Sequence, residues 1–354
     1  MGAVTPGLVC GHHHLYSALA RGMPAPPQAP AGFLEILQQV WWRLDAALDL
    51  EMLRASARLG ALEALMSGTT CIMDHHESPN AIDGSLSVIA DACAEVGVRV
   101  NVAYGVTDRW DDAGSLQGGG WPPPKMTDAA RRGLAETERF LRAGGRGMVG
   151  VHAAFTCSDD TLDAAAGLAE DLGVGVHIHV AEGAVDAGAG ARLQGLARDD
   201  WLLVHCVHLD RDLPGIIAHN PRSNMNNAVG YAHPTTRSNP VVLGTDGIGA
   251  DMLEEVRLAY ARLREDDVLA TPEAPWRWLE AGWRFFPEAE DDEVTWSYDH
   301  ADSPWHLAYT PGVRALRVVA AGEVLLDDGR PTRVDVDEVR AHASDQAHRL
   351  HARL

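Results

Sequence analysis

The chain has 354 residues, of which 46% are hydrophobic and 22% charged, as in a soluble globular protein and unlike a disordered one. Its 29 basic and 50 acidic side chains give a net charge of −21, which argues against nucleic acids and anionic membranes as partners. No apolar run approaches the ~20 residues of a membrane span, and the start of the chain lacks a signal-peptide pattern. Five scattered cysteines without a CxxC pair favour a reducing compartment, so we expect a cytoplasmic protein.

Short apolar runs alternate along the chain with segments that have the apolar spacing of helices. The predicted strands are Leu8–His14, Thr69–His75, Val98–Tyr104, Met148–Ala154, Val174–Val180, Trp201–Cys206, Ile216–Asn220 and Val241–Asp246. Predicted helices between them include Gly84–Val96, Thr127–Arg142 and Thr161–Leu172. Such alternation implies parallel strands with right-handed crossovers, and the number of strands fits an α/β fold of the (β/α)₈ TIM-barrel type. An open doubly wound sheet is the alternative, but no Gly-rich turn follows the first strand.

The connections between these strands differ greatly in length. Leu15–Gly68 is long enough for two helices over the barrel mouth, one of which carries Trp41 and Trp42. In contrast, Val207–Gly215 and Pro221–Pro240, on either side of the seventh strand, are shorter than a full crossover helix with its loops requires. We therefore expect an incomplete outer ring of helices there.

The last part of the chain predicts a small β-structure followed by a helix. Arg314–Val334 has the pattern of a hairpin with Asp327-Asp-Gly at its turn, and a polar helix is predicted over Val336–Leu354. We expect two domains, a barrel over residues 1–290 and a C-terminal hairpin plus helix over residues 291–354. An unpaired, alternating Val318–Leu326 edge would favour pairing between chains and hence a homodimer.

Two histidine pairs end predicted strands. His12 and His14 lie two residues apart, so both can reach one metal ion from the same side of the first strand, while His13 points away. His177 and His179 repeat this spacing on the fifth strand, and a carboxylate, Glu182, follows as a candidate acid or base. The alternatives are a His-rich surface loop for the first pair and two core histidines for the second.

His205 and Asp246 end the sixth and eighth predicted strands, at the barrel rim where the two histidine pairs also lie. A lone histidine on an apolar strand is usually a core residue. An aspartate after a strand is often a helix N-cap, but Asp251 could serve as that cap instead. Because it faces four histidines, Asp246 is better explained as a metal ligand.

Seven ordered blocks carry a resemblance to a known family. They are PGLVCGHHHLYSALARGMP, GTTCIMDHHESPN, VHAAFTCSDDTL, VHIHVAEG, LLVHCVHL, IAHNPRSNMNNAVGYA and LGTDGIGADM. In sequence and order they resemble the amidohydrolase superfamily, in its branch of cytosine deaminase, guanine deaminase and triazine hydrolase, with the SsnA-like aminohydrolases most similar. Family members begin with β-structure that pairs with C-terminal strands in a small sandwich. Only five residues precede Pro6 here, so the resemblance implies a sandwich remnant whose N-terminal half is missing.

The resemblance also implies site residues. It implies one divalent metal ion, zinc before iron or manganese, and assigns Glu182 and His205 to catalysis. The implied metal ligands are His12, His14, His179 and Asp246. The tentative substrate contacts are His152, His75, Asn224 and Trp41. Structural hydrogen bonding is the alternative role for His75 and Asn224, and core packing is the alternative for Trp41.

This set of residues predicts a metal-dependent aminohydrolase. A divalent ion lowers the pKa of its bound water from about 15.7 toward about 7. Asp246 would accept the water's proton, His205 would stabilise developing negative charge, and Glu182 would protonate a ring nitrogen, so that ammonia leaves a purine, a pyrimidine or a related heterocycle. The alternatives are a triazine-type hydrolase with another leaving group, and a catalytically impaired chain that acts as a metal-binding or interaction protein.

Overall fold

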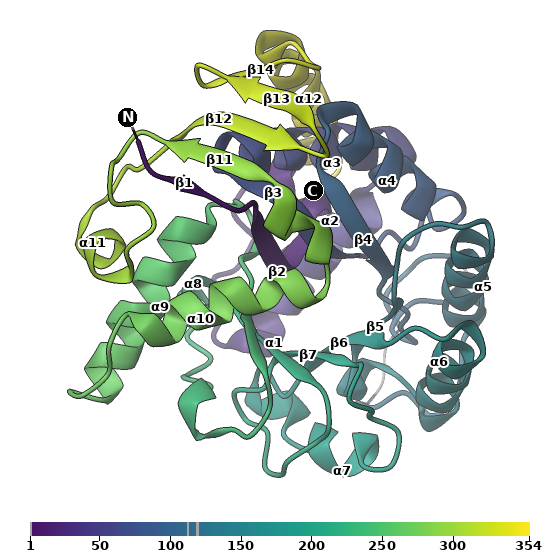
Figure 1. The fold of residues 1–354 in the computed structure, drawn as a ribbon. Coiled ribbons are helices and arrows are strands. Elements are labelled where there is room, and N and C mark those ends of the chain that lie inside the picture. Colours follow the sequence, from purple (N-terminus) through teal and green to yellow (C-terminus); the bar gives the residue numbers. More distant parts are fainter. Residues whose placement is uncertain (1, 112, 118–119) are drawn as a thin grey trace.

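The computed structural model describes residues 2–111, 113–117 and 120–354, and its main body is a closed barrel of parallel strands (Figure 1). In chain order the strands are β2 (Leu8–His14), β3 (Thr69–His76), β4 (Arg99–Tyr104), β5 (Val149–Ala153), β6 (Val176–Val180), β7 (Leu202–His205), β8 (Ile216–His219) and β9 (Val241–Leu243). β10 (Asp246–Gly247) continues β9 and pairs in parallel with β2, and two bridges join β4 to the β5 segment. The (β/α)₈ prediction is confirmed, and the open-sheet alternative is wrong.

Helices cover the outside of the barrel unevenly. α4 (Ser85–Val96), α5 (Asp128–Arg142) and α6 (Asp159–Leu172) follow β3, β4 and β5. The last two begin at capping side chains, because Thr127 accepts a hydrogen bond from the Ala130 amide and Ser158 accepts one from the Thr161 amide. α7 (Ala189–Leu193) and α8 (Pro221–Asn226) are short, and residues 206–215, all described, contain neither helix nor strand. The predicted gap in the outer ring is therefore present.

The barrel interior is filled by every second residue of its strands. One contiguous apolar cluster contains Val9, Cys71, Met73, Leu202, Val204, Ile216, Ala218, Val242 and Phe286. The alternate side chains, such as Ile72 and Ile178, pack in the layer between the strands and the outer helices. Polar residues that continue the inward rows toward the carboxyl ends of the strands consequently share one site.

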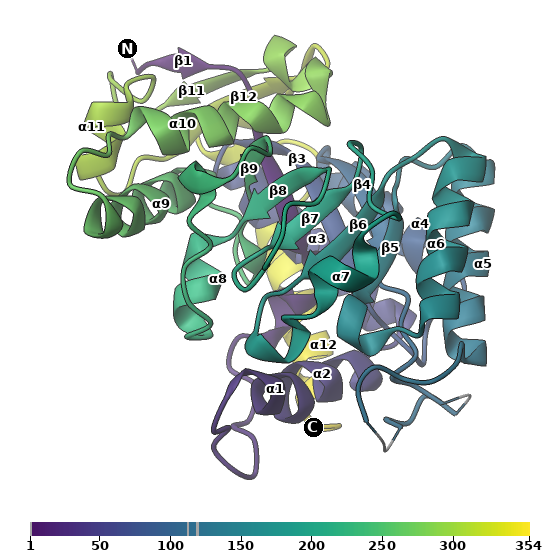
Figure 2. The ribbon, with the colours of Figure 1, turned by 90° about the horizontal axis from the view of Figure 1, so that it is seen from below.

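The long connection after β2 covers the mouth of the barrel. It holds α1 (Phe33–Ile36), one π-helical turn η2 (Leu37–Trp41), α2 (Trp42–Ala47) and α3 (Leu50–Met66). Figure 2 shows α1 and α2 at the end of the barrel opposite to the small antiparallel sheet. The mouth-covering helices expected in this connection are therefore present.

The small sheet has the order β1 (Val4–Thr5), β11 (Glu293–Trp296), β12 (Ala315–Ala320), β13 (Glu323–Asp327) and β14 (Arg330–Pro331). The main turn lies at Ala321–Gly322, where both residues have positive φ, and a second turn of the same kind at Asp328–Gly329 joins β13 to β14. The turn expected at Asp327-Asp-Gly is thus present, where it joins β13 to β14. The turn at Ala321–Gly322 was not expected, so a single hairpin over Arg314–Val334 is wrong. The unpaired Val318–Leu326 edge is also wrong, because β12 and β13 are paired on both sides.

Three further helices and the C-terminal helix complete the chain. They are α9 (Met252–Asp266), α10 (Glu273–Glu280), α11 (Pro304–Tyr309) and α12 (Val336–His351). α12 packs against α3, and Arg58 of α3 forms an ion pair with Glu338 of α12. None of the helices in the described part of the chain combines the length and the apolar character needed to cross a membrane.

Candidate metal and catalytic site

A local irregularity in β2 brings His12 and His14 to the inner side of the barrel. Val9 packs inside and Cys10 packs outside, so strict alternation would turn His12 outward. The pairing of β2 with β3 shifts register between Cys10 and His13, and this bulge re-aims the following residues. His13 is buried elsewhere, with its Nδ1 atom 2.7 Å from Thr245 Oγ1.

Left-handed backbone conformations orient two other side chains of the site. On β7, alternation after the inward Val204 would direct His205 away from the barrel axis, but His205 has a φ of 70°. Asp246, which follows β9, has a φ of 61°. Such conformations are costly for residues other than glycine and persist where surrounding structure holds them, which occurs often at functional sites.

The side chains of His12, His14, His179 and Asp246 converge at one point. The Nε2 atoms of His12 and His14 lie 3.1 Å and 3.0 Å from Asp246 Oδ1, and His179 Nε2 lies 3.2 Å from His14 Nε2. His205 Nε2 is 3.9 Å from the same carboxylate oxygen. Three imidazoles and one carboxylate around one point form a donor set that suits zinc and similar divalent metals.

The other ring nitrogens of these histidines have partners that orient them. His14 Nδ1 donates to the His75 carbonyl over 2.5 Å, and His179 Nδ1 donates to the His152 carbonyl over 2.7 Å. His12 Nδ1 shares a 2.8 Å hydrogen bond with His177 Nε2. Because the Nδ1 atoms of His14 and His179 donate to these carbonyls, Nε2 is in both rings the nitrogen that faces the common point and that a metal ion would bind once it carries no proton.

The protonation states are consistent with the same role. Burial lowers the pKa of His12 and of His179 well below the usual value, so both rings stay neutral at pH 7. Although burial acts in the opposite direction, hydrogen bonds from His12 and His14 hold the pKa of Asp246 well below its usual range. Two neutral imidazoles and an ionised carboxylate therefore face the point at which the donor atoms meet. Although burial opposes the shift, the hydrogen bond and charge of Asp246 raise the pKa of the third imidazole, His14, above its usual value.

Glu182 and His205 lie beside this point. Glu182 Oε2 is 3.4 Å from His205 Nε2, a buried atom that has no hydrogen bond among the described residues. Burial raises the pKa of Glu182 to about 7, with His205 opposing and Asp246 reinforcing that shift. A carboxyl group with this pKa is able both to deliver and to accept a proton near neutral pH.

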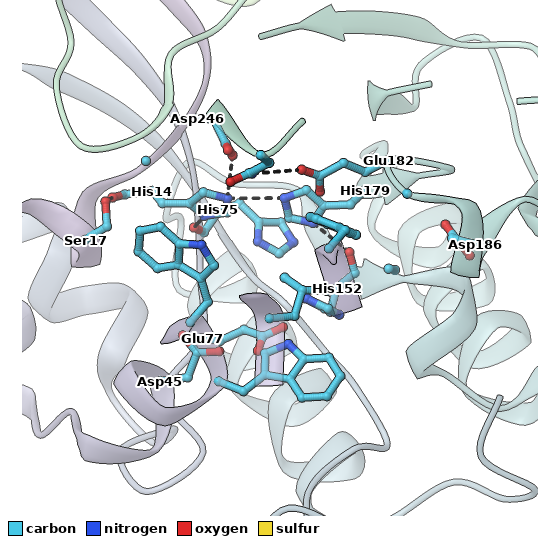
Figure 3. A pocket seen from close by; sticks show the side chains of 18 of the residues that line it. His14, Ser17, Asp45, His75, Glu77, His152, His179, Glu182, Asp186 and Asp246 are labelled. Carbon is cyan, nitrogen blue, oxygen red and sulfur yellow. Dashed lines mark hydrogen bonds and ion pairs between the residues drawn. The ribbon is translucent and has the colours of Figure 1, made fainter. Parts of the chain in front are cut away.

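A cavity of about 730 Å³, part of it open to solvent, opens above the cluster. Figure 3 shows Asp246, His14, His179 and Glu182 grouped at one end. His75, His152 and Trp41, all expected on the substrate side, line this cavity. Asn224 instead accepts a 2.8 Å hydrogen bond from His205 Nδ1 through its Oδ1 atom, which matches the structural alternative considered for it.

Sequence reasoning missed several residues of the site. His177, which was considered only as a ligand or a core residue, orients the His12 ring through the hydrogen bond between His177 Nε2 and His12 Nδ1. Ser223 donates a short hydrogen bond to Asp246 Oδ2, and Asn227 Nδ2 lies 3.4 Å from Glu182 Oε1. Together with Asn224, these residues of α8 and the position after it contact three groups of the site. The sequence signal for this segment was the polar run SNMNN (residues 223–227). Asp45 also lines the cavity from the mouth-covering helix α2, and no motif pointed to it.

Comparison with known proteins places this site in a family. The model of the amidohydrolase family matches residues 3–281. The chain belongs to the amidohydrolase family. It is 32% identical over 291 residues to a 5'-deoxyadenosine deaminase of Methanopyrus kandleri, covering 72% of this chain and 61% of that protein. It is also 30% identical over 295 residues to a 5-methylthioadenosine/S-adenosylhomocysteine deaminase of Symbiobacterium thermophilum, covering 74% and 62%. The chain thus spans about three fifths of the length of these relatives.

Solved structures show the same fold in this family. An adenosine deaminase from Xanthomonas campestris with bound zinc has a TM-score of 0.79 at 23% identity, covering 99% of this chain and 86% of that one. Atrazine chlorohydrolase from Arthrobacter aurescens, in complex with zinc, has a TM-score of 0.76 at 22% identity, covering 97% and 88%. At this identity the likeness establishes the fold alone.

Proposed function

We propose that this chain is a metal-dependent aminohydrolase that removes an amino group from an N-heterocycle of the purine or pyrimidine type. The observation that carries the proposal is the convergence of His12, His14, His179 and Asp246, with Glu182 beside them, at one end of a cavity that is partly open to solvent. The names of the two deaminase relatives support a purine derivative as the substrate class.

The proposed ligands are His12, His14, His179 and Asp246, and the proposed cofactor is one divalent ion, zinc before iron or manganese. The donor set fits such an ion, because its side chains are buried or largely buried, close together and oriented by outer partners. Two proteins of the same fold, the adenosine deaminase and the atrazine chlorohydrolase, have zinc bound in their solved structures. We expect no second ion. Amidohydrolases with two ions usually bridge them with a carboxylated lysine at the end of a barrel strand, and the only lysine of this sequence, Lys125, lies in a loop outside the barrel strands.

When bound, such an ion supplies an activated water molecule at neutral pH. Asp246 is placed to take a proton, since Ser223 fixes its Oδ2 atom and leaves Oδ1 toward the cluster. Glu182 delivers a proton to the ring nitrogen of the heterocycle. His205, held by Asn224, stabilises negative charge that develops on the attacked carbon's oxygen. Trp41, His75 and His152 would contact the heterocycle from the cavity wall.

The test is release of ammonia from a panel of purines, pyrimidines and their nucleosides by the metal-loaded protein. Ammonia release that disappears with a chelator and returns with zinc is the expected result. Release of chloride or an alkylamine from triazines, without deamination, would favour the triazine-hydrolase alternative. A chain that binds no metal and turns over nothing would favour the interaction-protein alternative.

Other expectations are not tested by the structure. The division into units at residues 1–290 and 291–354, the cytoplasmic location and the homodimer stay predictions. A homodimer was expected because Val318–Leu326 would form an unpaired edge. That reason does not hold, since this segment contains the turn between β12 and β13, each of which pairs with a strand on both sides.

A further inference from the structure

The helix α1, at the mouth of the barrel (Figure 2), is held there by side-chain packing. None of its four residues is buried, and most of residues 21–32, which precede it, are exposed. Among the described residues, no hydrogen bond joins residues 24–36 to a residue outside the connection that follows β2 (residues 15–68). A segment with few buried contacts and few hydrogen bonds to the rest of the fold opens locally at a low cost in free energy.

Phe33, the first residue of α1, reaches the cavity and contacts its rim. Its ring lines the cavity. It also packs directly on Gly183, the residue after Glu182: a β-carbon added at Gly183 would overlap Phe33 Cδ1 and lie 3.0 Å from Phe33 Cε1. The ring therefore occupies the space in which any other residue at position 183 would place its side chain.

The backbone at Gly183 does not itself require glycine. With a φ of −113° and a ψ of 166°, it has an extended conformation that every residue type adopts. The three atoms nearest to an added β-carbon all belong to the Phe33 ring. An alanine side chain would thus fit the backbone and would conflict first with Phe33. The glycine at this position consequently serves to make room for that ring.

The position beside Glu182 connects this contact with the chemistry of the site. Glu182 and Phe33 both line the cavity, and Leu37 and Trp41 line it from the same mouth-covering connection. This connection therefore presents an apolar face to a ligand. A ring seated on Gly183 covers the cavity next to the carboxyl group that would transfer a proton, and an apolar cover keeps bulk water away from such a step.

We propose that Phe33 is a further substrate-contacting residue and that α1 is a lid, which is closed when the Phe33 ring is seated on Gly183. The ligand enters while α1 is displaced. Closure brings the ring against an apolar edge of the heterocycle beside Glu182 and excludes water there. The inference rests on the proposed function only in placing the heterocycle next to Glu182.

The first test is hydrogen–deuterium exchange of the peptide that covers residues 33–41, in metal-loaded protein without ligand. Gly183→Ala should raise its exchange rate at least about threefold, because the lid loses its seat. Gly188→Ala is the matched control and should leave the rate unchanged. Gly188 lies in the same connection after β6, is exposed, has a φ of −79° and has open space around an added β-carbon. If Gly183→Ala does not fold, as judged by circular dichroism, Phe33→Ala makes the same test by removing the ring.

The second test adds a ligand to metal-loaded Glu182→Gln protein, so that turnover does not disturb the measurement. The probes are 5'-deoxyadenosine and cytosine. The bound probe should slow exchange of the same peptide at least about threefold, which a residue that only packs in the fold would not show. Phe33→Ala should weaken binding of the probe in calorimetry at least about fivefold, and Phe33→Leu, which keeps an apolar cover, at most about twofold. Tyr309→Ala removes an exposed ring of α11 and should bind the probe unchanged.

Equal exchange rates in Gly183→Ala and Gly188→Ala would overturn the lid. A bound probe that leaves the exchange of α1 unchanged, equal binding by Phe33→Ala and Tyr309→Ala, or no binding of either probe would overturn the substrate contact. The proposed function fails separately: a protein whose lid responds to Gly183→Ala and to the probe, but whose unsubstituted form releases no ammonia from any heterocycle, would keep the lid and lose the deaminase assignment.

Discussion

Replacing Glu182 with glutamine separates proton transfer from metal binding. Glu182 contacts His205 and Asn227, and its carboxylate is not one of the four groups that meet at the proposed metal position. Glutamine has nearly the same size, and its side-chain oxygen can still accept the hydrogen bond from Asn227. It cannot deliver and recover a proton. We therefore expect the variant to purify with its metal and to lose turnover.

The size of the loss follows from the role. Removal of a general acid or base costs about 10²–10⁴-fold in rate, which is about 2.7–5.4 kcal/mol of activation free energy at about 1.36 kcal/mol per factor of ten. Asp246→Asn should behave differently, because Asp246 receives hydrogen bonds from His12 and His14 and would be both ligand and proton acceptor. In that variant metal affinity and rate should fall together.

The assay measures kcat by ammonia release and metal content by plasma emission on the same preparations. Glu138→Gln, an exposed helical carboxylate on α5, is the control for an altered net charge and should match the unsubstituted protein. A Glu182→Gln protein without metal would make Glu182 a ligand. Near-normal kcat would mean that the proton comes from another group, and the division of roles proposed here would be wrong.

Three other predictions concern the metal, a buried ion triad and pH. Titration with zinc should saturate at one tightly bound equivalent per chain, and two would contradict the absence of a bridging group. The buried guanidinium of Arg109, in the segment after β4, pairs with the buried carboxylates of Asp45 and Glu77. Arg109→Met should therefore lower the free energy of unfolding by about 3–5 kcal/mol in urea, because it leaves both carboxylates unpaired. The exposed Arg131→Met should cost at most about 1 kcal/mol, and equal losses would contradict this expectation. Burial raises the pKa of Glu255 from 4.5 to about 7, although the charge of Arg222 opposes the shift. The folded state therefore binds this proton more tightly than the unfolded chain, and the free energy of unfolding falls as the pH rises from 4.5 to 7. Glu255→Gln should flatten that part of the pH–stability curve, and an unchanged slope would refute the assignment.

The barrel could be predicted from the sequence because its strands are continuous apolar runs bounded by turns and helical patterns. Leu8–His14 has the predicted bounds, and the β9 segment differs only in a break before Asp246. The turn at Asp328–Gly329 was predictable because Asp-Gly is a strong local signal, whereas the turn of the same kind at Ala321–Gly322, with an alanine at a φ of 51°, was missed. Both turns exist, and the chain alone does not reveal which one separates the longer strands.

The candidate site was predictable where it depends on the spacing of residues along a strand. Alternation predicts that the two histidines of each pair share one side, and Glu182 follows from its position after a strand end. The inward direction of His12 and His14 depends on the bulge between Cys10 and His13. The inward direction of His205 and Asp246 depends on left-handed backbone conformations, which the neighbouring residues in the sequence do not predict. The triad of Asp45, Glu77 and Arg109 joins three distant segments, so only the folded chain brings it together.

The most direct test of the central claim is the position of the metal ion by anomalous scattering from crystals of the zinc-loaded protein. The structure offers two overlapping groups of donors, one with His12, His179, His205 and Asp246 and the other with His14, His75 and His179. Our account predicts one anomalous peak, bonded to His12, His14 and His179 through Nε2 and to Asp246 through a carboxylate oxygen, with His205 and Glu182 outside bonding distance. A peak bonded to His205 or His75 in place of these ligands, two peaks about 3.5 Å apart, or no peak at all would contradict it.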